Sequence, residues 1–195
     1  MPKVIVTEFL SLDGVAQAPG GPEEDTSGGF AHGGWHMAYG DETLRKWVMS
    51  GINDAAGFLL GRRTYEIFAS YWPIAPEAPQ EVAEPLNTKP KHVATTTLSD
   101  PLEWENSTVL QGEVPEAVKA LKNGDGGDLY VIGSTALTQS LVQHGLVDEL
   151  RLMITPILLG GGKRIFPEDG ALRRMSLASH EVMSTGGILA TYVPD

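Results

Sequence analysis

Two segments place glycine beside arginine or hydroxyl side chains where an apolar run gives way to a helical pattern. The first is Gly61-Arg62-Arg63-Thr64, which follows the run at 55–60. Free backbone N–H groups at the start of a helix attract anions, and the helix dipole adds to this attraction. Glycine lets a phosphate approach closely, and arginine forms charge-assisted hydrogen bonds to it. The segment therefore predicts a phosphate site, with an ordinary helix N-terminus and two solvated arginines as the alternative.

The second segment is Gly133-Ser134-Thr135-Ala136-Leu137, which follows the apolar run at 129–132. Ser134 or Thr135 is a natural N-cap, so helix capping alone explains these residue types without any ligand. Two junctions of this kind in one sheet nevertheless favour a dinucleotide, because such a ligand needs sites for several phosphates and rings.

A third glycine-rich segment, Gly160-Gly161-Gly162-Lys163, matches a phosphate-binding P-loop only in part. No Ser or Thr follows Lys163 and no helical pattern comes after it, which excludes a nucleoside triphosphatase of that type. The three glycines allow a ligand to approach the backbone closely, and they suit a tight turn or a bulge equally well.

Other kinds of catalytic centre find little support in the residue types. The chain has no cysteine, which excludes disulfides, thiolate nucleophiles and thiolate metal sites. His32 and His36 lie four residues apart, but among glycines where no helix is expected, so no metal site is predicted. A nicotinamide enzyme, by contrast, needs few reactive side chains, because the cofactor carries the hydride and the protein aligns it.

The elements that must position these segments follow from apolar periodicity and turn residues. Strands are predicted at 4–10, 55–60, 92–97, 108–111, 129–132, 149–158, 176–183 and 188–193, and helices at 41–53, 62–71, 81–86, 115–122 and 136–144. Alternating strands and helices predict parallel pairing with crossover helices, and the last two strands predict an antiparallel hairpin. The loop at 17–34 is either an active-site lid or a disordered surface insertion.

Length and charge limit the domain organisation and the partners. The 195 residues suit a single domain, 1–195, and the net charge of −11 repels nucleic-acid and lipid phosphates at long range. We therefore expect neither nucleic acid nor a membrane as a partner. The N-terminus lacks a signal-peptide layout, and no window approaches the roughly 18 apolar residues of a membrane span, so a cytoplasmic location is expected.

Taken in order and spacing, these residues resemble the dihydrofolate-reductase-like family that includes the reductase domain of the bifunctional riboflavin-biosynthesis deaminase/reductase. The resemblance covers nearly the whole chain, and its motifs are Ser11-Leu12-Asp13-Gly14, Gly61 to Glu66, Tyr130 to Ser134, Gly145 to Leu150, Pro156 to Gly162 and Phe166. It implies an α/β, three-layer α-β-α fold with a mixed, mostly parallel sheet and a C-terminal antiparallel hairpin. It also implies NADPH as the reductant and a flat pterin-like or aminopyrimidine-like substrate. The zinc deaminase half of the bifunctional enzyme has no counterpart here, which leaves a different substrate open.

The same resemblance implies a set of cofactor contacts. Those for phosphates are Gly61, Arg62, Arg63 and Thr64, with Arg62 or Arg63 near the 2′-phosphate, and Gly133, Ser134, Thr135, Ala136 and Leu137 around the pyrophosphate. Thr95 and Thr96 are implied beside the adenosine, and Val15 and Ala16 beside the nicotinamide. Leu159, Gly160 and Gly161 are implied to form a further stretch that approaches the cofactor.

Asp13 is the predicted catalytic residue, because a carboxylate there can hydrogen-bond a ring N–H and assist protonation, directly or through water. Its alternative role is that of a turn residue before Gly14. Dihydrofolate reductases present a carboxylate from their first helix, whereas Asp41 and Glu42 stand too early in the corresponding helix to match. Asp13 and Trp35, at the end of the long loop, are the predicted substrate contacts.

Three functions remain open at this point. The first is an NADPH-dependent reductase, the second a nucleotide- or small-molecule-binding module that has lost the reaction, and the third a structural dimer without a ligand. The strands near the C-terminus also predict a homodimer, because uncovered strand edges and apolar faces seek partners.

Overall fold

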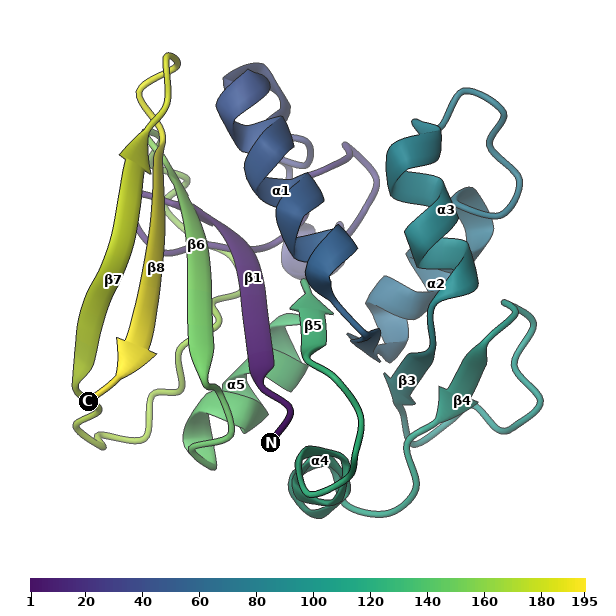
Figure 1. Cartoon of the computed structure of the whole chain (residues 1–195). Helices are drawn as coiled ribbons and strands as arrows, with labels where there is room; N and C mark the ends of the chain where they lie inside the picture. The colour runs from purple at the N-terminus through teal and green to yellow at the C-terminus, as the bar shows by residue number, and fades with distance from the viewer.

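A single eight-stranded sheet organises the chain in the computed structural model, which describes residues 1–195 (Figure 1). The strand order is β4-β3-β2-β5-β1-β6-β8-β7. The strands are β1 Val4–Ser11, β2 Gly57–Gly61, β3 Lys91–Ala94, β4 Ser107–Val109, β5 Leu129–Ile132, β6 Glu149–Thr155, β7 Met175–Val182 and β8 Ile188–Pro194. Pairing is parallel from β4 to β6, and β8 runs antiparallel to both β6 and β7. The predicted mixed sheet with a C-terminal hairpin is confirmed.

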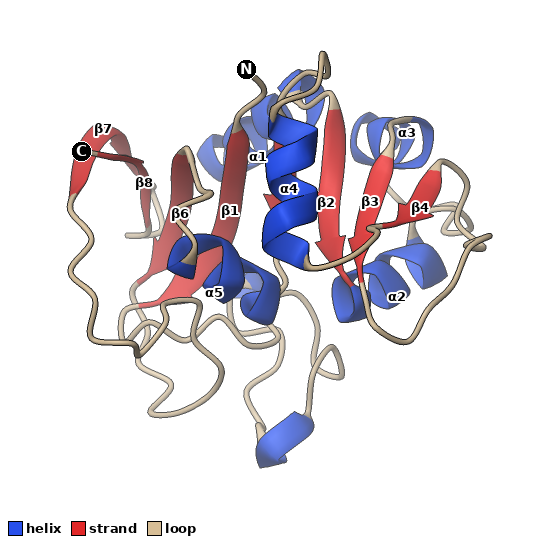
Figure 2. Cartoon of the chain, turned by 90° about the horizontal axis from the view of Figure 1, so that it is seen from below, coloured by secondary structure: helices blue, strands red, loops and turns tan.

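Helices cover both faces of this sheet. On one face lie α1 Glu42–Asp54, α2 Arg62–Tyr71 and α3 Gln80–Thr88, and on the other lie α4 Val114–Lys122 and α5 Thr135–Gln143. Figure 2 shows α4 and α5 across the sheet from α1 and α3. The predicted three-layer α/β architecture is therefore confirmed. No helix is both long and apolar enough to cross a membrane.

The central strand β1 is buried on both faces because β5 and β6 pair with its two edges and helices cover it above and below. Val4, Val6 and Leu10 pack into the core beneath α4 and α5, while Phe9 packs toward α1 on the opposite face. A strand in this position has a nearly continuous apolar sequence instead of a strict alternation, as β1 does.

Several boundaries differ from the prediction for local reasons. β3 ends at Ala94 and not at Thr97, because the Thr95 hydroxyl accepts hydrogen bonds from the Thr97 and Leu98 N–H groups and closes a turn. β6 ends at Thr155 because Pro156 has no N–H to continue the ladder. Thr95 and Thr96 consequently follow the third strand as a turn.

Candidate functional site

A cleft of about 580 Å³ lies at the carboxyl ends of the central parallel strands. This is where open α/β sheets bind ligands, and the volume falls within the roughly 300–1,000 Å³ of small-molecule and cofactor sites. β1 contributes Glu8 and Phe9, and the loop that follows it contributes a wall that includes Ala16 and Asp25. The remaining walls come from the first turns of α2 and α5 and from the segment after β3.

Two helix N-termini face this cleft without side-chain caps. Gly61 precedes α2 and Ser134 precedes α5, and neither helix start receives a capping hydrogen bond from a side chain. The Ser134 hydroxyl instead accepts the Gly61 N–H at 2.8 Å and lies 2.7 Å from the Thr64 hydroxyl. Ser134 thus occupies a predicted N-cap position, but its hydroxyl does not cap the helix. Its hydroxyl joins the two junctions and leaves the first-turn N–H groups of both helices available to an anion.

Close packing at these junctions depends on residue 61 having no side chain. A Cβ atom at Gly61 would lie 2.7 Å from Ser134 Oγ and 2.9 Å from Ser134 Cβ, closer than side chains normally approach. Gly133 and Ser134 both have left-handed backbone conformations, with φ of 65° and 68°. The turn between β5 and α5 is therefore sharp enough to bring its backbone against the start of α2.

Cationic side chains stand at the rim of the cleft and already have carboxylate partners. Arg63 Nη1 lies 3.0 Å from Asp25, and Lys163 Nζ forms an ion pair with the same carboxylate. Arg62 pairs with Glu66 along the helix surface at 3.0 Å. Partial burial acts to raise the pKa of Asp25, but hydrogen bonds from Lys163 and Ser27 outweigh it and lower the pKa to about 2. Asp25 therefore marks a position where two cations converge on one anionic group.

These features fit a dinucleotide such as NADPH. The uncapped starts of α2 and α5 suit its phosphates, and the cations around Asp25 suit a further phosphate. Apolar residues that suit the rings also line the cleft, namely Phe9, Ile67, Phe68, Leu110 and Ile132.

The structure brings most of the predicted cofactor residues to this one cleft. Those that line it are Ala16, Gly61, Arg62, Arg63, Thr64, Thr95, Thr96, Gly133, Ser134, Thr135, Ala136 and Leu137. Val15 is fully buried and does not line the cleft. Leu159 and Gly161 line a smaller hollow of about 470 Å³ beside it, and Gly160 lines neither hollow.

Asp13, the predicted catalytic residue, lies outside the cleft lining. Its carboxylate accepts hydrogen bonds from the Ser11 hydroxyl at 2.6 Å and from the N–H groups of Leu159 and Gly160 at 3.1 and 2.8 Å. The Ser11 bond, followed by the backbone bonds, lowers its pKa to about 2. Through these hydrogen bonds the ionised carboxylate holds the backbone at Leu159 and Gly160 against the turn after β1. The geometry fits the alternative role of a turn residue, and the catalytic role of Asp13 stays a prediction.

Trp35, the predicted substrate contact, also lies outside the cleft lining. Only 7% of it is exposed, and its indole Nε1 donates a hydrogen bond to the Gln17 carbonyl at 2.8 Å. The Gln17 side chain in turn donates to the carbonyls of Asp25 and Ser27. Trp35 therefore anchors the folded loop at 17–34, and the loop presents other residues to the cleft.

Sequence reasoning missed several residues that line the cleft, including Glu8, Phe9, His36 and Lys163. His36 stacks on Phe9 with 4.4 Å between ring centroids, and burial lowers the His36 pKa to about 4, which makes it neutral near pH 7. Glu8 is a charged residue type within a largely apolar, buried strand. That position was a usable signal, because a carboxylate is seldom buried without a specific reason.

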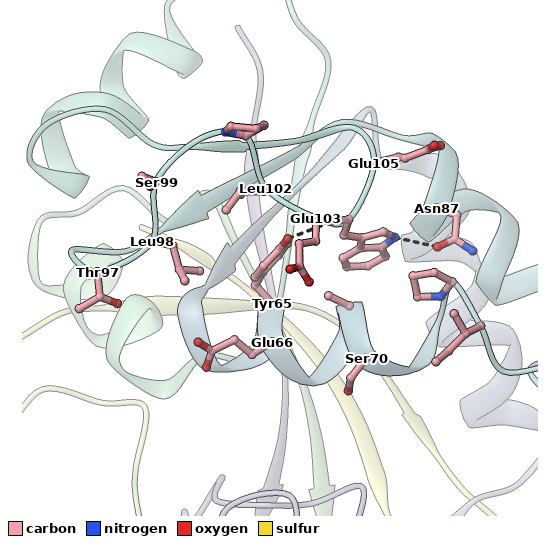
Figure 3. Close-up of a pocket in the computed structure, with 15 residues that line it drawn as sticks. Tyr65, Glu66, Ser70, Asn87, Thr97, Leu98, Ser99, Leu102, Glu103 and Glu105 are labelled. Atoms are coloured by element: carbon pink, nitrogen blue, oxygen red, sulfur yellow. Dashed lines mark hydrogen bonds between the residues drawn. The ribbon is translucent and has the colours of Figure 1, made fainter.

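A second hollow, of about 1000 Å³, lies between α2 and the segment at 97–105 (Figure 3). Tyr65 and Trp104 meet at its base, where the Tyr65 hydroxyl accepts a hydrogen bond from the backbone N–H of Trp104 at 3.1 Å. Its charged lining residues are Glu66, Glu103 and Glu105, all acidic. A phosphate-bearing ligand is repelled there, so the cleft at the strand ends is the candidate dinucleotide site.

The fold and the cleft together define an α/β protein of the dihydrofolate-reductase-like class. Within that class the chain belongs to the RibD C-terminal domain family, which it matches over residues 2–189. No group of three or more His, Cys, Asp or Glu side chains in residues 1–195 is arranged to share a metal ion.

Several known proteins are similar to this chain in sequence or in fold. YyaP, an uncharacterized protein of Bacillus subtilis strain 168, is 27% identical over 144 residues, which cover 72% of this chain and 75% of YyaP. The crystal structure of a putative riboflavin biosynthesis protein from Shewanella sp. PV-4 has a TM-score of 0.76 at 21% identity and covers 99% of both chains. A dihydrofolate reductase from Enterococcus faecalis, complexed with NADP(H), has a TM-score of 0.61 at 16% identity over 99% of this chain and 96% of its own. At these identities the solved structures establish the fold.

Proposed function

We propose that the protein is an NADPH-dependent reductase of a small pterin-like or aminopyrimidine-like heterocycle. The observation that carries this proposal is the pair of uncapped helix N-termini that meet at Ser134 and face one cleft. Membership of the RibD C-terminal domain family supports it, as does the fold shared with a dihydrofolate reductase.

In this proposal the starts of α2 and α5 bind the cofactor phosphates, and Arg63 and Lys163 bind the 2′-phosphate in place of Asp25. Phe9 and Ile132 exclude water from the ring-binding part of the cleft. NADPH, when bound, supplies the hydride for reduction of a C=N or C=O bond. The residues of this chain align the cofactor and substrate and provide the proton.

Titration with NADPH and NADH, followed by quenching of the four tryptophans, tests the cofactor site. We expect NADPH to bind more tightly than NADH, and Arg63→Ala to weaken NADPH binding at least about tenfold, because it removes a charge-assisted hydrogen bond worth about 1.5–3 kcal/mol. NADH binding should change little in the same variant. Arg45→Ala is a matched control, because Arg45 pairs with Glu42 and Glu81 and lies outside the cleft lining. Absence of binding by either nucleotide contradicts the proposal.

A second candidate function is a binding module that takes the nucleotide without turning it over. The placement of Asp13 favours it, because the residue predicted to assist protonation is ionised and lies outside the cleft. Loss of absorbance at 340 nm with a panel of pterins and aminopyrimidines distinguishes the two functions. NADPH binding without oxidation across the panel supports the binding module. NADPH binding with or without oxidation argues against a purely structural dimer.

We also propose that the protein forms a homodimer through β7, a strand at one edge of the sheet. Every residue of β7 is exposed, including Leu177 at 51% and Val182 at 66%, and the preceding segment exposes 82% of Leu172. An uncovered edge with apolar side chains favours pairing with a second copy. Light scattering at micromolar concentration should give twice the 20.9 kDa chain mass, and Leu177→Lys should shift it toward the monomer. A monomeric mass for the wild type contradicts this expectation.

A further inference from the structure

The floor of the cleft contains a buried carboxyl group that the cofactor-binding scheme does not use. Glu8 lies in β1, lines the cleft and is only 3% exposed. Its side chain points to the face of the sheet covered by α5, where the Thr138 hydroxyl donates a hydrogen bond to Oε1 at 2.9 Å. Oε2 has no hydrogen-bond partner in the protein. One oxygen is thus held in place while the other is available to carry a proton.

The surroundings of Glu8 favour its uncharged form. Burial raises its pKa to about 8; the Thr138 hydrogen bond acts in the opposite direction, and the nearby Glu24 carboxylate adds to the rise. The other charged or titratable residues around the cleft are Asp25, His36, Arg62, Arg63, Glu113 and Lys163. Arg62, Arg63 and Lys163 are paired with Glu66 or Asp25, and His36 is neutral near pH 7. No cation pairs with Glu8, so it retains its proton near neutral pH.

The position of Glu8 also limits which part of a ligand can lie against it. A phosphate is disfavoured there, because the burial that keeps Glu8 uncharged also penalises a phosphate anion, and no cation pairs with this position. An uncharged or cationic ring can lie against Glu8. Glu8 and Phe9 are consecutive residues of β1 that both line the cleft, Glu8 from the face covered by α5 and Phe9 from the face covered by α1. Phe9 is one of the apolar residues that suit the rings, so we assign a ring to the part of the cleft formed by the end of β1.

We propose that Glu8 is the catalytic acid of this cleft, lying against the nicotinamide ring and giving its Oε2 proton to the substrate. This inference rests on the proposed reductase function. Glu8 gives the proton to the nitrogen or oxygen of a C=N or C=O bond, and the carbon of that bond receives the hydride, with its two electrons, from NADPH. Glu8 is left as a carboxylate beside the cationic ring of NADP⁺, and it regains a proton from water after product release. Thr138 is a positioning residue, because it fixes Oε1 and touches neither reacting atom.

This arrangement makes the proton on Glu8 depend on the redox state of the nicotinamide. The ring of NADP⁺ is cationic and stabilises a carboxylate, whereas the ring of NADPH is neutral and does not. By linkage, NADP⁺ binding releases a proton from Glu8 below pH 8, and NADP⁺ affinity rises by up to about tenfold per pH unit as the pH approaches 8. NADPH affinity lacks this pH dependence. Any pH dependence that arises from the 2′-phosphate is the same for both nucleotides.

Calorimetry in two buffers of different ionisation enthalpy at pH 7.5 measures this difference without a substrate. For the wild type we expect NADP⁺ to release most of one proton more than NADPH does. Glu8→Gln, which keeps the shape of the protonated group and can still accept from Thr138, should bind both nucleotides with equal proton counts. Asp13→Asn is the matched control, because its carboxylate lies outside the cleft, and the wild-type difference should persist in it. Thr138→Val removes a hydrogen bond that favours the carboxylate, so it should move the NADP⁺ affinity profile to higher pH.

The outcomes separate this inference from the function on which it rests. Equal proton counts for the two nucleotides in the wild type, with normal binding, overturn the role of Glu8 and leave the cofactor site intact. A difference that persists in Glu8→Gln, or that disappears in Asp13→Asn, also overturns it. Failure of the wild type to bind either nucleotide overturns both proposals. Once a substrate is identified, Glu8→Gln should lower kcat by at least about a hundredfold, as expected for loss of a general acid.

Discussion

Replacing Gly61 with alanine should weaken NADPH binding at least tenfold, although the change adds only one methyl group. The new Cβ atom would lie within 3 Å of both Cβ and Oγ of Ser134, which the left-handed backbone at residue 134 keeps in place. The starts of α2 and α5 must then move apart, and the two sets of N–H groups no longer converge on one ligand. Overpacking of this kind also lowers the free energy of unfolding by about 1–3 kcal/mol. Nucleotide titration and thermal unfolding measure the two effects.

A second substitution separates this mechanism from general damage to the fold. Ser134→Gly in the Gly61→Ala background removes both clashing atoms, and glycine tolerates the left-handed conformation at residue 134. The double variant should recover stability relative to Gly61→Ala alone. Gly126→Ala is the control, because a Cβ there meets nothing within 4 Å, and it should bind NADPH as the wild type does. A Gly61→Ala protein with unchanged affinity and stability would show that the junctions are not closely packed.

Gly51→Ala should lower the free energy of unfolding by about 3 kcal/mol or more, the upper part of the range for overpacking. Gly51 lies within α1, where replacement by alanine usually stabilises a helix by about 0.5–1 kcal/mol. Here the sign reverses, because the Cβ would overlap the buried ring and hydroxyl of Tyr130 and approach Arg151 Nη1 to 2.7 Å. For a chain of this length the melting temperature should fall by about 6–12 °C.

The partner at this contact provides the control. Tyr130→Phe removes a buried hydroxyl that has no hydrogen-bond partner, so alone it should cost little stability. Because the ring itself also overlaps the new Cβ, Tyr130→Phe should recover only part of the loss caused by Gly51→Ala. A double-mutant cycle with the four proteins gives the coupling between residues 51 and 130. If Gly51→Ala has wild-type stability, α1 does not pack against Tyr130 in this way.

The sequence predicted the architecture well because periodicity and turn chemistry act locally. The strand-to-helix junctions at Gly61 and Gly133 were located correctly, since each combines an apolar run, a glycine and a helical pattern within about ten residues. Because β2 and β5 are parallel neighbours, both junctions lie at the same end of the sheet, where the strands have their carboxyl ends. The sequence analysis did not predict that Ser134 contacts Thr64 and accepts the Gly61 N–H, because these contacts join segments about 70 residues apart.

The reactive side chains were harder to predict, because their roles depend on residues far away in the sequence. Asp13 receives hydrogen bonds from Leu159 and Gly160, and these bonds lower the pKa of its carboxyl group to about 2 and tie it to the turn. Trp35 was predicted as a substrate contact, but its indole donates a hydrogen bond to the Gln17 carbonyl, a partner that only the folded loop supplies. The raised pKa of Glu8 depends on burial beneath α5, which only the assembled sheet creates.

The ion pairs of Asp25 imply that the proposed binding of a 2′-phosphate is an exchange of anions within the protein. Arg63 and Lys163 share this single carboxylate, which offsets half of their charge, so a phosphate that arrives there displaces an internal counter-ion as well as ions from solution. Nucleotide affinity should accordingly depend less on ionic strength than binding to two unpaired surface cations does. The Asp25 carbonyl also accepts a hydrogen bond from the Gln17 side chain, and the Gln17 carbonyl accepts one from Trp35. A phosphate that displaces Asp25 should therefore also shift the backbone at Gln17.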